Sequence, residues 1–445
     1  MEEEKVSVII KFKKGTAQAN IDGVTALEAN VKHVYSSINA VSAVVPKKRL
    51  GNIQSDSNVE YIELDQEAHI LGGNRRPLGL EFKIDVLSSA QIVPWGISKI
   101  RADQVWSNNK GAGIKVCVID TGVDYNHEDL KDNYKGGYNF LNNTNNPFDD
   151  HGHGTHVSGT IAALDNSIGV VGVAPEAHIY SCKVLDSNGS GSYSNIIAGI
   201  DWAINNQMQI ISMSLGGSGF SQALKDACDA AYNGGILIIA AAGNSGSDTD
   251  TIGYPAKFDS VVAVGATDQN DVRASFSSVG PKLEVCSPGV EVLSTVPKGT
   301  CKMCDPSGYR QANGTSMATP HVSGTAALVY KAYPGISNVD VRKALGDTVV
   351  HLGTPGRNIQ YGYGRIDAKA AVDLVPPPVK KYRCSGTPDY VCIEDQNGPF
   401  DSLAACQTAC QAPAKKYRCT GSPDFQCVED VNGPYNSLSE CQAVC

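Results

Sequence analysis

Three polar residues stand where a buried strand ends or a helix begins, and together they could make a hydroxyl nucleophilic. Asp120 closes "VCVID", His153 lies in the glycine-rich "DDHGHGTHVSGTIAAL", and Ser316 opens the apolar stretch "TSMATPHVSGTAALVY". A buried Asp can orient a His, and the His can then take the proton of a Ser hydroxyl. Each residue alone has a plain alternative: a turn-forming Asp, a surface His or a helix-capping Ser. Their combination predicts acyl transfer through a serine nucleophile.

The segments that must position these residues cover residues 90–375. Short apolar runs such as "GIKVCVID", "IISMSLG" and "ILIIAAAG" alternate there with helical stretches. This pattern is typical of a parallel sheet covered by helices on both faces, which makes the region α/β. Functional sites of such sheets gather at the carboxyl ends of the strands. We therefore expect the three residues to meet at that edge.

Two regions of different character flank the α/β part. Residues 1–71 contain the strand patterns "VSVIIKF", "AVSAVVP" and "VEYIEL" and one helical stretch at "GVTALEANVKHV", which predicts a small α+β domain. Residues 72–89 are typical of a loop or extension, and 376–381 form a proline-rich linker.

Eight of the 14 cysteines lie in two copies of one motif, at 382–410 and 411–445, with the spacing C-x7-C-x13-C-x3-C. So many cysteines in so short a unit indicate two disulfides that hold a module too small to bury a core. Zinc is the weaker alternative, because the units lack His and paired C-x2-C knuckles. The last two cysteines of each copy fall at i and i+4 of a short helix, so we predict that they bond to the two upstream cysteines of their own repeat. The eight positions are Cys384, Cys392, Cys406, Cys410, Cys419, Cys427, Cys441 and Cys445.

The other six cysteines are less easily assigned. Cys117 and Cys182 lie in predicted core strands, where Cys usually acts as a small apolar residue. Cys301 and Cys304 form a C-x2-C close before Ser316. A local disulfide, pairing elsewhere and two thiols are all open for that pair.

Composition limits the function further. The 445 residues are 42% hydrophobic and 19% charged, with a net charge of −9, as in an ordinary soluble protein. No basic stripe is available for nucleic acid, and no apolar run is long enough to cross a bilayer. The acidic start "MEEEKVSVII" is not a signal peptide, although the cysteine repeats indicate an oxidising compartment. Either the sequence has been trimmed or an export segment lies upstream.

The motifs "VIDTGVD", "HGTHVSGT" and "GTSMATPHVSG", in the order Asp, His, Ser, resemble the signatures of the subtilisin-like serine proteases, the subtilases. The resemblance runs from about Gln91 to the end of the α/β region. It implies the subtilisin-like three-layer fold, with Asp120, His153 and Ser316 as the catalytic triad. It also implies that Asn244 in "IIAAAGNSG" is the oxyanion donor beside the Ser316 backbone N–H. His156 and His321 would be structural.

The resemblance also implies two edge segments that pair with extended substrate, and a primary pocket. No Asp or Glu stands among the pocket walls, which favours broad cleavage after large apolar or aromatic residues. The implied substrate-binding residues are Gly189, Gly191, Tyr193, Ser214, Leu215, Gly216, Ala241, Gly243 and Gly253.

The segment "LDNSIGVVG" resembles the family's calcium loop, in which hard oxygen ligands come from carbonyls and side chains. A polar turn without metal is the alternative. The implied Ca²⁺ ligands are Gln91, Asp129, Leu164, Asn166, Ile168 and Val170.

Residues 1–71 resemble the inhibitory propeptide that precedes many subtilases, with "VEYIELDQEAHIL" as its tail and Leu71 at the cleavage position. An unrelated domain that stays attached is the alternative. The sequence thus predicts a secreted, monomeric, calcium-stabilised serine endopeptidase made as a zymogen, acting on proteins or peptides and inhibited by its own propeptide. The competing hypothesis is a catalytically silent binding protein with the same fold that displays the cysteine repeats.

Overall fold

The computed structural model describes residues 4–445 except 14–21, 24, 26–27, 72–89, 247, 375–381, 386–390, 396–397, 411–415, 421–425, 431 and 433. The predicted extension at 72–89 and the proline-rich linker at 376–381 lie outside the described residues. The described chain divides into two compact units, residues 1–374 and 375–445.

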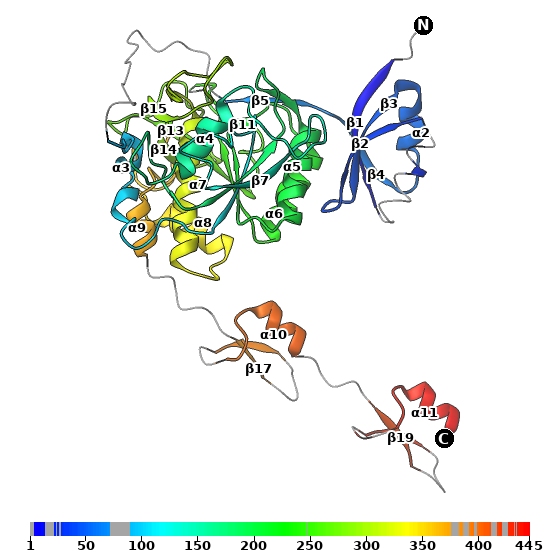
Figure 1. Cartoon of the computed structure of the whole chain (residues 1–445). Coiled ribbons are helices and arrows are strands. Elements are labelled where there is room, and N and C mark those ends of the chain that lie inside the picture. Colours follow the sequence, from blue (N-terminus) through cyan, green and yellow to red (C-terminus); the bar gives the residue numbers. More distant parts are fainter. Residues whose placement is uncertain are drawn as a thin grey trace. The chain divides into compact units, whose positions relative to one another are not determined.

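A seven-stranded sheet forms the centre of the first unit, in the order β14-β13-β12-β10-β6-β8-β7, and every neighbouring pair is parallel. Its middle strands are buried along their whole length because helices cover both faces (Figure 1). The strands are β6 (Lys115–Asp120), β7 (Tyr134–Asn139), β8 (His178–Lys183), β10 (Ile210–Met213), β12 (Leu237–Ala241), β13 (Val261–Thr267) and β14 (Leu283–Pro288).

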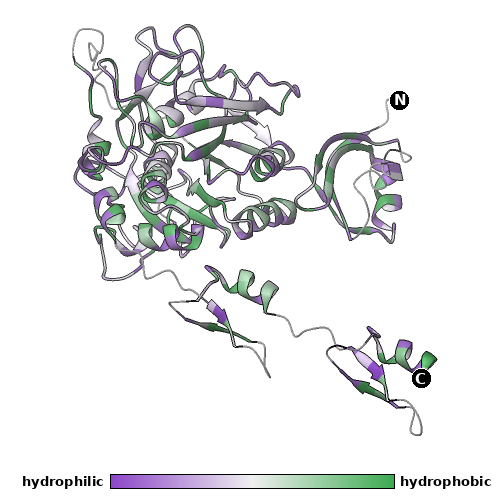
Figure 2. Ribbon diagram, turned by 60° about the horizontal axis from the view of Figure 1, so that its bottom comes forward, coloured by the Kyte–Doolittle hydropathy of each residue, from purple (hydrophilic) through white to green (hydrophobic). Residues whose placement is uncertain are grey.

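The two faces of this sheet bury separate apolar clusters. One contains residues of α4 (His153–Ala162), α7 (Thr315–Ala332) and α8 (Asn338–Asp347). The other contains residues of α5 (Tyr193–Asn205) and α6 (Gln222–Asn233). Figure 2 shows hydrophobic residues concentrated in the central strands. The predicted α/β fold with three layers is confirmed.

None of the described helices is long and apolar enough to span a membrane.

Shorter elements complete this part of the chain. The remaining elements are α3 (Trp95–Lys99), η2 (Ala102–Gln104), β9 (Ser190–Ser192), β11 (Leu215–Gly216), β15 (Val292–Thr295), β16 (Tyr309–Ala312) and α9 (Ala368–Asp373).

Residues before the central sheet form a four-stranded antiparallel sheet in the order β2-β3-β1-β4. The helix expected at 23–34 is wrong in its second half, because Asn30–Tyr35 forms strand β2. Exposure alternates along β2 with the period of two that a strand requires, and that alternation overrides the helical pattern. The elements are β1 (Lys5–Phe12), β2 (Asn30–Tyr35), β3 (Ala40–Pro46), η1 (Lys47–Arg49), α2 (Leu50–Gln54), β4 (Val59–Leu64) and β5 (Glu67–Ile70).

One face of this small sheet packs on helices α5 and α6, since Ile9 and Tyr35 belong to the same buried cluster as those helices. Two carboxylates complete the contact at the helix starts. Glu63 accepts a hydrogen bond from Gln222 N (2.9 Å), and Asp65 accepts one from Ser194 N (2.9 Å). Negative groups are stabilising there because the first backbone N–H groups of a helix lack partners within it.

Each C-terminal repeat is a two-stranded hairpin followed by a short helix. The disulfides Cys384–Cys410 and Cys392–Cys406 hold the first, and Cys419–Cys445 and Cys427–Cys441 hold the second. The predicted bonding of each helical pair to the upstream cysteines is confirmed. The elements are β17 (Tyr382–Cys384), β18 (Cys392–Glu394), α10 (Leu403–Ala409), β19 (Tyr417–Cys419), β20 (Cys427–Glu429) and α11 (Leu438–Val444).

Candidate active site

Asp120 and His153 meet at the carboxyl edge of the central sheet. Asp120 is the last residue of β6 and His153 the first of α4, and both side chains are fully buried. His153 Nδ1 lies 2.7 Å from Asp120 Oδ1. An ionised carboxylate only accepts hydrogen bonds, so Nδ1 carries the proton and Nε2 is left as the acceptor. This is the tautomer that a general base needs.

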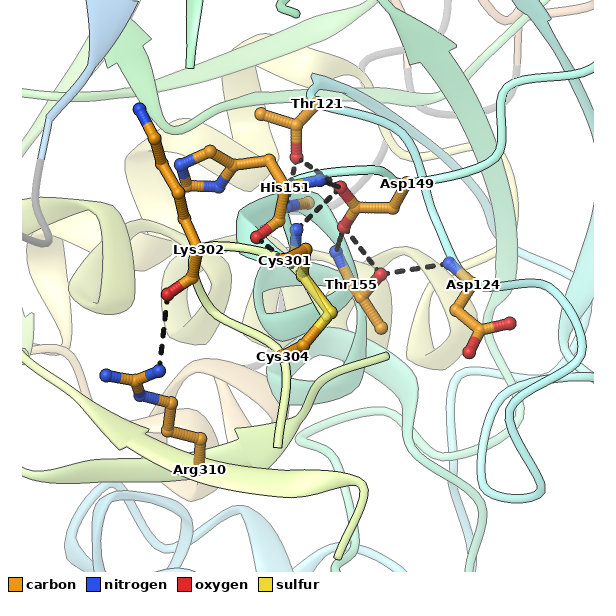
Figure 3. Close-up of a disulfide and its surroundings, with 11 residues drawn as sticks. Thr121, Asp124, Asp149, His151, Thr155, Cys301, Lys302, Cys304 and Arg310 are labelled. Atoms are coloured by element: carbon orange, nitrogen blue, oxygen red, sulfur yellow. Dashed lines mark hydrogen bonds between the residues drawn. A yellow bond between two sulfur atoms is a disulfide. The ribbon is translucent and has the colours of Figure 1, made fainter. Parts of the chain in front are cut away.

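A buried carboxylate that the sequence analysis missed fixes the loop before His153. Asp149 is 1% exposed. Its oxygens accept backbone hydrogen bonds from His151, Gly152 and Thr155 and hydroxyl hydrogen bonds from Thr121 and Thr155, at 2.6–3.0 Å (Figure 3). Nothing in the spacing of the motif "DDHGHGTH" separates Asp149 from its exposed neighbour Asp150. Only the three-dimensional contacts assign it this positioning role.

Ser316 is the second residue of α7, at the positive end of that helix. Its hydroxyl donates to the carbonyl of Leu71 and also lies 3.0 Å from the Ser214 carbonyl oxygen. His153 Nε2 has no hydrogen-bond partner among the described residues. The serine hydroxyl is thus turned toward Leu71 in this structure, and the Ser316–His153 hydrogen bond is not formed.

Asn244 follows the end of β12, close to the start of α7. Its Oδ1 accepts hydrogen bonds from Thr315 N (3.0 Å) and Thr315 Oγ1 (3.1 Å). These contacts fix which side of the amide is oxygen and leave the NH₂ group as a donor for another acceptor. The Ser316 backbone N–H lies at the same helix start, where backbone donors lack partners within the helix.

An extended segment lies between two strands of the peptidase part and ends at Ser316. Strand β5 pairs antiparallel with β9 on one side and with β11 on the other. Ile70 N donates to Gly189 O (2.9 Å) and Leu71 N to Ser214 O (3.4 Å). The edge segments expected to bind extended substrate are therefore occupied by residues 67–71 of the same chain.

One of the expected pocket residues, Gly216, contacts the Leu71 side chain. A Cβ added to Gly216 would lie 3.0 Å from Leu71 Cδ1, so Leu71 packs directly on this glycine. Two backbone contacts lie next to the other expected pocket residues: Gly217 pairs with Tyr254, and Gly253 N donates to Ala242 O (3.0 Å). These contacts join the segments that contain Gly216, Ala241 and Gly253. Three of the other expected substrate-binding residues contact strand β5 or the residue before it: Gly191 pairs with Ala68, Leu215 pairs with Ile70, and Tyr193 N donates to Gln66 O (2.8 Å). Gly243 lies beside the start of α7, where its N donates to Thr315 Oγ1 (3.2 Å).

The six residues expected to bind Ca²⁺ also come together. Gln91 Nε2 lies 2.6 Å from Leu164 O and 3.1 Å from Asn166 Oδ1, Ile168 O and Val170 O. Two amide protons cannot satisfy four oxygens, whereas a hard cation takes six to eight oxygen ligands. Asp129 lies beside this cage, where its Oδ1 accepts a hydrogen bond from Asn166 (2.7 Å). The donor set fits calcium.

Two further histidines of the motifs are buried and neutral. His156 Nε2 lies 3.0 Å from the Val292 carbonyl oxygen, and His321 Nδ1 lies 2.9 Å from the Met317 carbonyl oxygen. Burial lowers the pKa of His156 to about 3 and that of His321 to about 4. Within the part of the chain that the structure describes, neither forms a hydrogen bond with the Ser316 hydroxyl.

A buried Asp–His pair at the carboxyl edge of a parallel α/β sheet and a serine at a helix start are the features expected of a serine peptidase. The family model described as "Subtilase family" matches residues 111–364, and the chain belongs to this family as a subtilisin-like serine endopeptidase. It is 46% identical to subtilisin NAT of Bacillus subtilis subsp. natto over 79% of this chain and 85% of that protein. It is 53% identical to subtilisin DY of Bacillus licheniformis over 63% of this chain and 99% of that protein. A thermostable alkaline protease of Halalkalibacterium halodurans is 41% identical over 83% of this chain and 92% of that protein.

Proposed function

We propose that the chain is the precursor of a secreted, calcium-stabilised serine endopeptidase that removes residues 1–71 from itself by cutting after Leu71. The observation that carries this proposal is the contact between the Ser316 hydroxyl and the Leu71 carbonyl, at the end of a strand paired on both sides. A segment bound in this way has the geometry of a substrate. The same pairing makes residues 67–71 an occupant of the cleft, which supports an inhibitory propeptide.

In the proposed reaction, the Ser316 oxygen attacks the Leu71 carbonyl carbon while His153 Nε2 takes the hydroxyl proton. Asp120 holds the imidazolium that forms. Negative charge develops on the former carbonyl oxygen, where the Asn244 NH₂ and the Ser316 N–H would donate. His153 then gives its proton to the departing amine, and water hydrolyses the acyl-enzyme by the reverse sequence of transfers. The apolar Leu71 on Gly216 supports a preference for large apolar residues at the position before the cleaved bond.

The test uses the full chain and its Ser316→Ala variant. We expect the wild type to be cut after Leu71 and to react with a fluorophosphonate probe, and we expect the variant to accumulate uncut and unlabelled. N-terminal sequencing and intact mass report the cut. A folded wild type that never labels would instead support the silent binding protein. A fully active wild type with residues 1–71 still covalently attached would reject the propeptide assignment and leave the peptidase assignment intact.

Calcium is proposed at the cage formed by Gln91, Asp129, Leu164, Asn166, Ile168 and Val170. A cation bound to the folded state but not to the unfolded chain stabilises by about 2.7 kcal/mol at one hundred times its Kd. We expect a chelator to lower the Tm of the processed enzyme and to speed self-digestion. Asp129→Ala should lower the Tm in calcium and remove most of the chelator effect. An equal Tm with and without chelator in the wild type would reject the site.

The disulfides and the family support secretion and action on protein or peptide substrates. A monomer is expected, and size-exclusion chromatography with light scattering on the processed enzyme tests it.

A further inference from the structure

A small disulfide ring lies beside the loop that carries His153. Cys301 and Cys304 are bonded in the connection between β15 and β16, with Lys302 and Met303 between them. Met303 N donates to the His151 carbonyl oxygen (2.9 Å), and the Cys301 sulfur lies 3.1 Å from the same oxygen. The Met303 side chain is buried, whereas Lys302 is exposed. The ring is therefore fixed against His151, two positions before His153 (Figure 3).

Lys302 extends from this ring to the segment that binds the extended strand. Its Nζ donates to the Asn188 carbonyl oxygen (3.3 Å), and Asn188 immediately precedes Gly189. A Cβ added to Gly189 would lie 2.9 Å from Ile70 Cγ1, so the Ile70 side chain packs on this glycine. Ile70 is the second residue before the bond presented to Ser316, the position called P2. The Lys302 ammonium thus lies at the rim of the space that a P2 side chain fills.

The charge of Lys302 is poorly compensated by its surroundings. Among the described residues, the Lys302 ammonium donates to a neutral carbonyl. The carboxylates of this region are committed elsewhere: Asp149 to the loop before His153, Asp150 to Lys183 (2.7 Å), and Asp186 to the backbone of Asn188 and Ser190. The neighbouring His151 adds no negative charge. Burial lowers the pKa of His151, and the charge of Lys302 acts in the same direction.

We propose that Lys302, held by the Cys301–Cys304 ring, makes this peptidase favour substrates with Asp or Glu at P2. The proposal rests on the proposed function and names a substrate preference of the same cleft. A P2 carboxylate would meet a cation whose present acceptor is uncharged. Ile70 at this position of the chain's own tail makes no such ion pair, so the tail is not the best substrate for the cleft that it occupies. Because exposed ion pairs contribute at most about 1 kcal/mol, the expected preference is about three- to fivefold in kcat/KM.

The experiment compares two peptides that differ in one group. Both carry Ala at the fourth position before the bond and Leu at the first, as the tail does. One has Glu at P2 and the other has the neutral isostere Gln. Active-site titration with a fluorophosphonate fixes the enzyme concentration. We expect the processed wild type to cleave the Glu peptide about three to five times faster in kcat/KM, with the ratio falling as salt is added.

Three variants test whether Lys302 and the disulfide ring cause the preference for Glu at P2. Lys302→Gln should bring the Glu/Gln ratio close to one. Lys298→Gln is the matched control, because Lys298 lies in the same loop but pairs with Glu128 (2.7 Å), and its ratio should equal that of the wild type. The double variant Cys301→Ser/Cys304→Ser keeps the lysine but opens the ring, and its ratio should fall toward one.

The failures are distinguishable. A wild type with equal rates on both peptides, or a Lys302→Gln variant that keeps the preference, overturns the role of Lys302 alone. A double variant that keeps the wild-type ratio overturns the role of the ring. An enzyme that neither labels nor cleaves any peptide overturns the proposed function itself.

Discussion

The two cysteines of adjacent strands in the central sheet and the cysteines of the C-terminal repeats occupy opposite environments. Cys117 and Cys182 lie in adjacent strands of the central sheet, with their sulfurs 3.4 Å apart, and both remain thiols inside an apolar cluster. In the described residues of the repeats, the buried side chains are those of the disulfide-bonded Cys406, Cys410 and Cys441. A sheet covered on both faces buries enough apolar surface to need no crosslink, whereas a module of about 30 residues does not.

Reduction of the disulfides should produce the largest difference between the central sheet and the C-terminal repeats. Loss of one native disulfide costs small domains about 2–5 kcal/mol, and each repeat depends on two. We expect a strong reductant to unfold both repeats completely while the seven-stranded sheet stays protected. Hydrogen exchange followed by mass spectrometry measures this on the Ser316→Ala chain, which cannot digest itself. Repeats that keep their protection after complete reduction would show that they possess a core of another kind.

The second prediction concerns Asp149, whose place depends on the packed peptidase part. Asp149→Asn keeps the size of the side chain but turns an NH₂ group toward N–H and O–H donors, so buried donors lose their acceptor. Because His153 is then less well positioned, we expect kcat/KM on a short peptide to fall about 10–100-fold, mostly through kcat. The exposed Asp132→Asn is the control and should change neither constant. An Asp149→Asn enzyme with wild-type kcat would show that these contacts do not position His153.

The sequence predicts best what depends on local pattern. Short apolar runs predicted the parallel strands. The i, i+4 spacing of Cys406 and Cys410 predicted that they bond to the upstream cysteines, and this is confirmed. The helix expected at 23–34 failed in its second half because a pairing partner decides whether such a segment becomes a strand.

Contacts between distant segments were predicted only where a motif or the subtilase resemblance joined them. Glu63 and Asp65 cap helices that begin more than one hundred residues later, and Lys302 reaches Asn188. The meeting of Asp120 and His153 was expected from their places at a strand end and a helix start, and the subtilase resemblance gave them their roles. The structure adds that Ser316 contacts Leu71 in the uncut chain.

Acid should weaken the peptidase part through its buried histidines, a route that the repeats lack because they contain no His. Burial holds the pKa of His156 at about 3 and that of His321 at about 4, below the value of about 6.5 expected in the unfolded chain. Above about pH 6.5 both histidines are neutral in the folded and in the unfolded chain, so they do not change the free energy of unfolding. As pH falls below about 6.5, the unfolded chain takes up protons that the folded chain excludes, so the free energy of unfolding decreases.

Calorimetry from pH 8 to pH 4 on the Ser316→Ala chain should therefore show a steadily falling Tm for the peptidase part. His321→Gln removes one of these groups and should flatten the pH dependence, whatever its effect on Tm at pH 8. A variant whose Tm changes with pH in parallel with the starting chain would rule out His321 as a contributor.

The smallest effect is expected from removing the repeats. Residues 1–374 form a compact unit with their own clusters of buried residues, so a chain ending at Leu374 should process itself and cleave short peptides with kcat/KM within about twofold of the full chain. Leu374 is the necessary end point, because its carbonyl accepts a hydrogen bond from Tyr333. Ending the chain at Asp367 is the matched control. It removes α9, whose Ala368 and Ala371 are buried in the main cluster, and it should lower the Tm clearly. Peptide kinetics and Tm on the three chains make the comparison. A chain ending at Leu374 that folds but cleaves short peptides tenfold more slowly would mean that the repeats take part in catalysis.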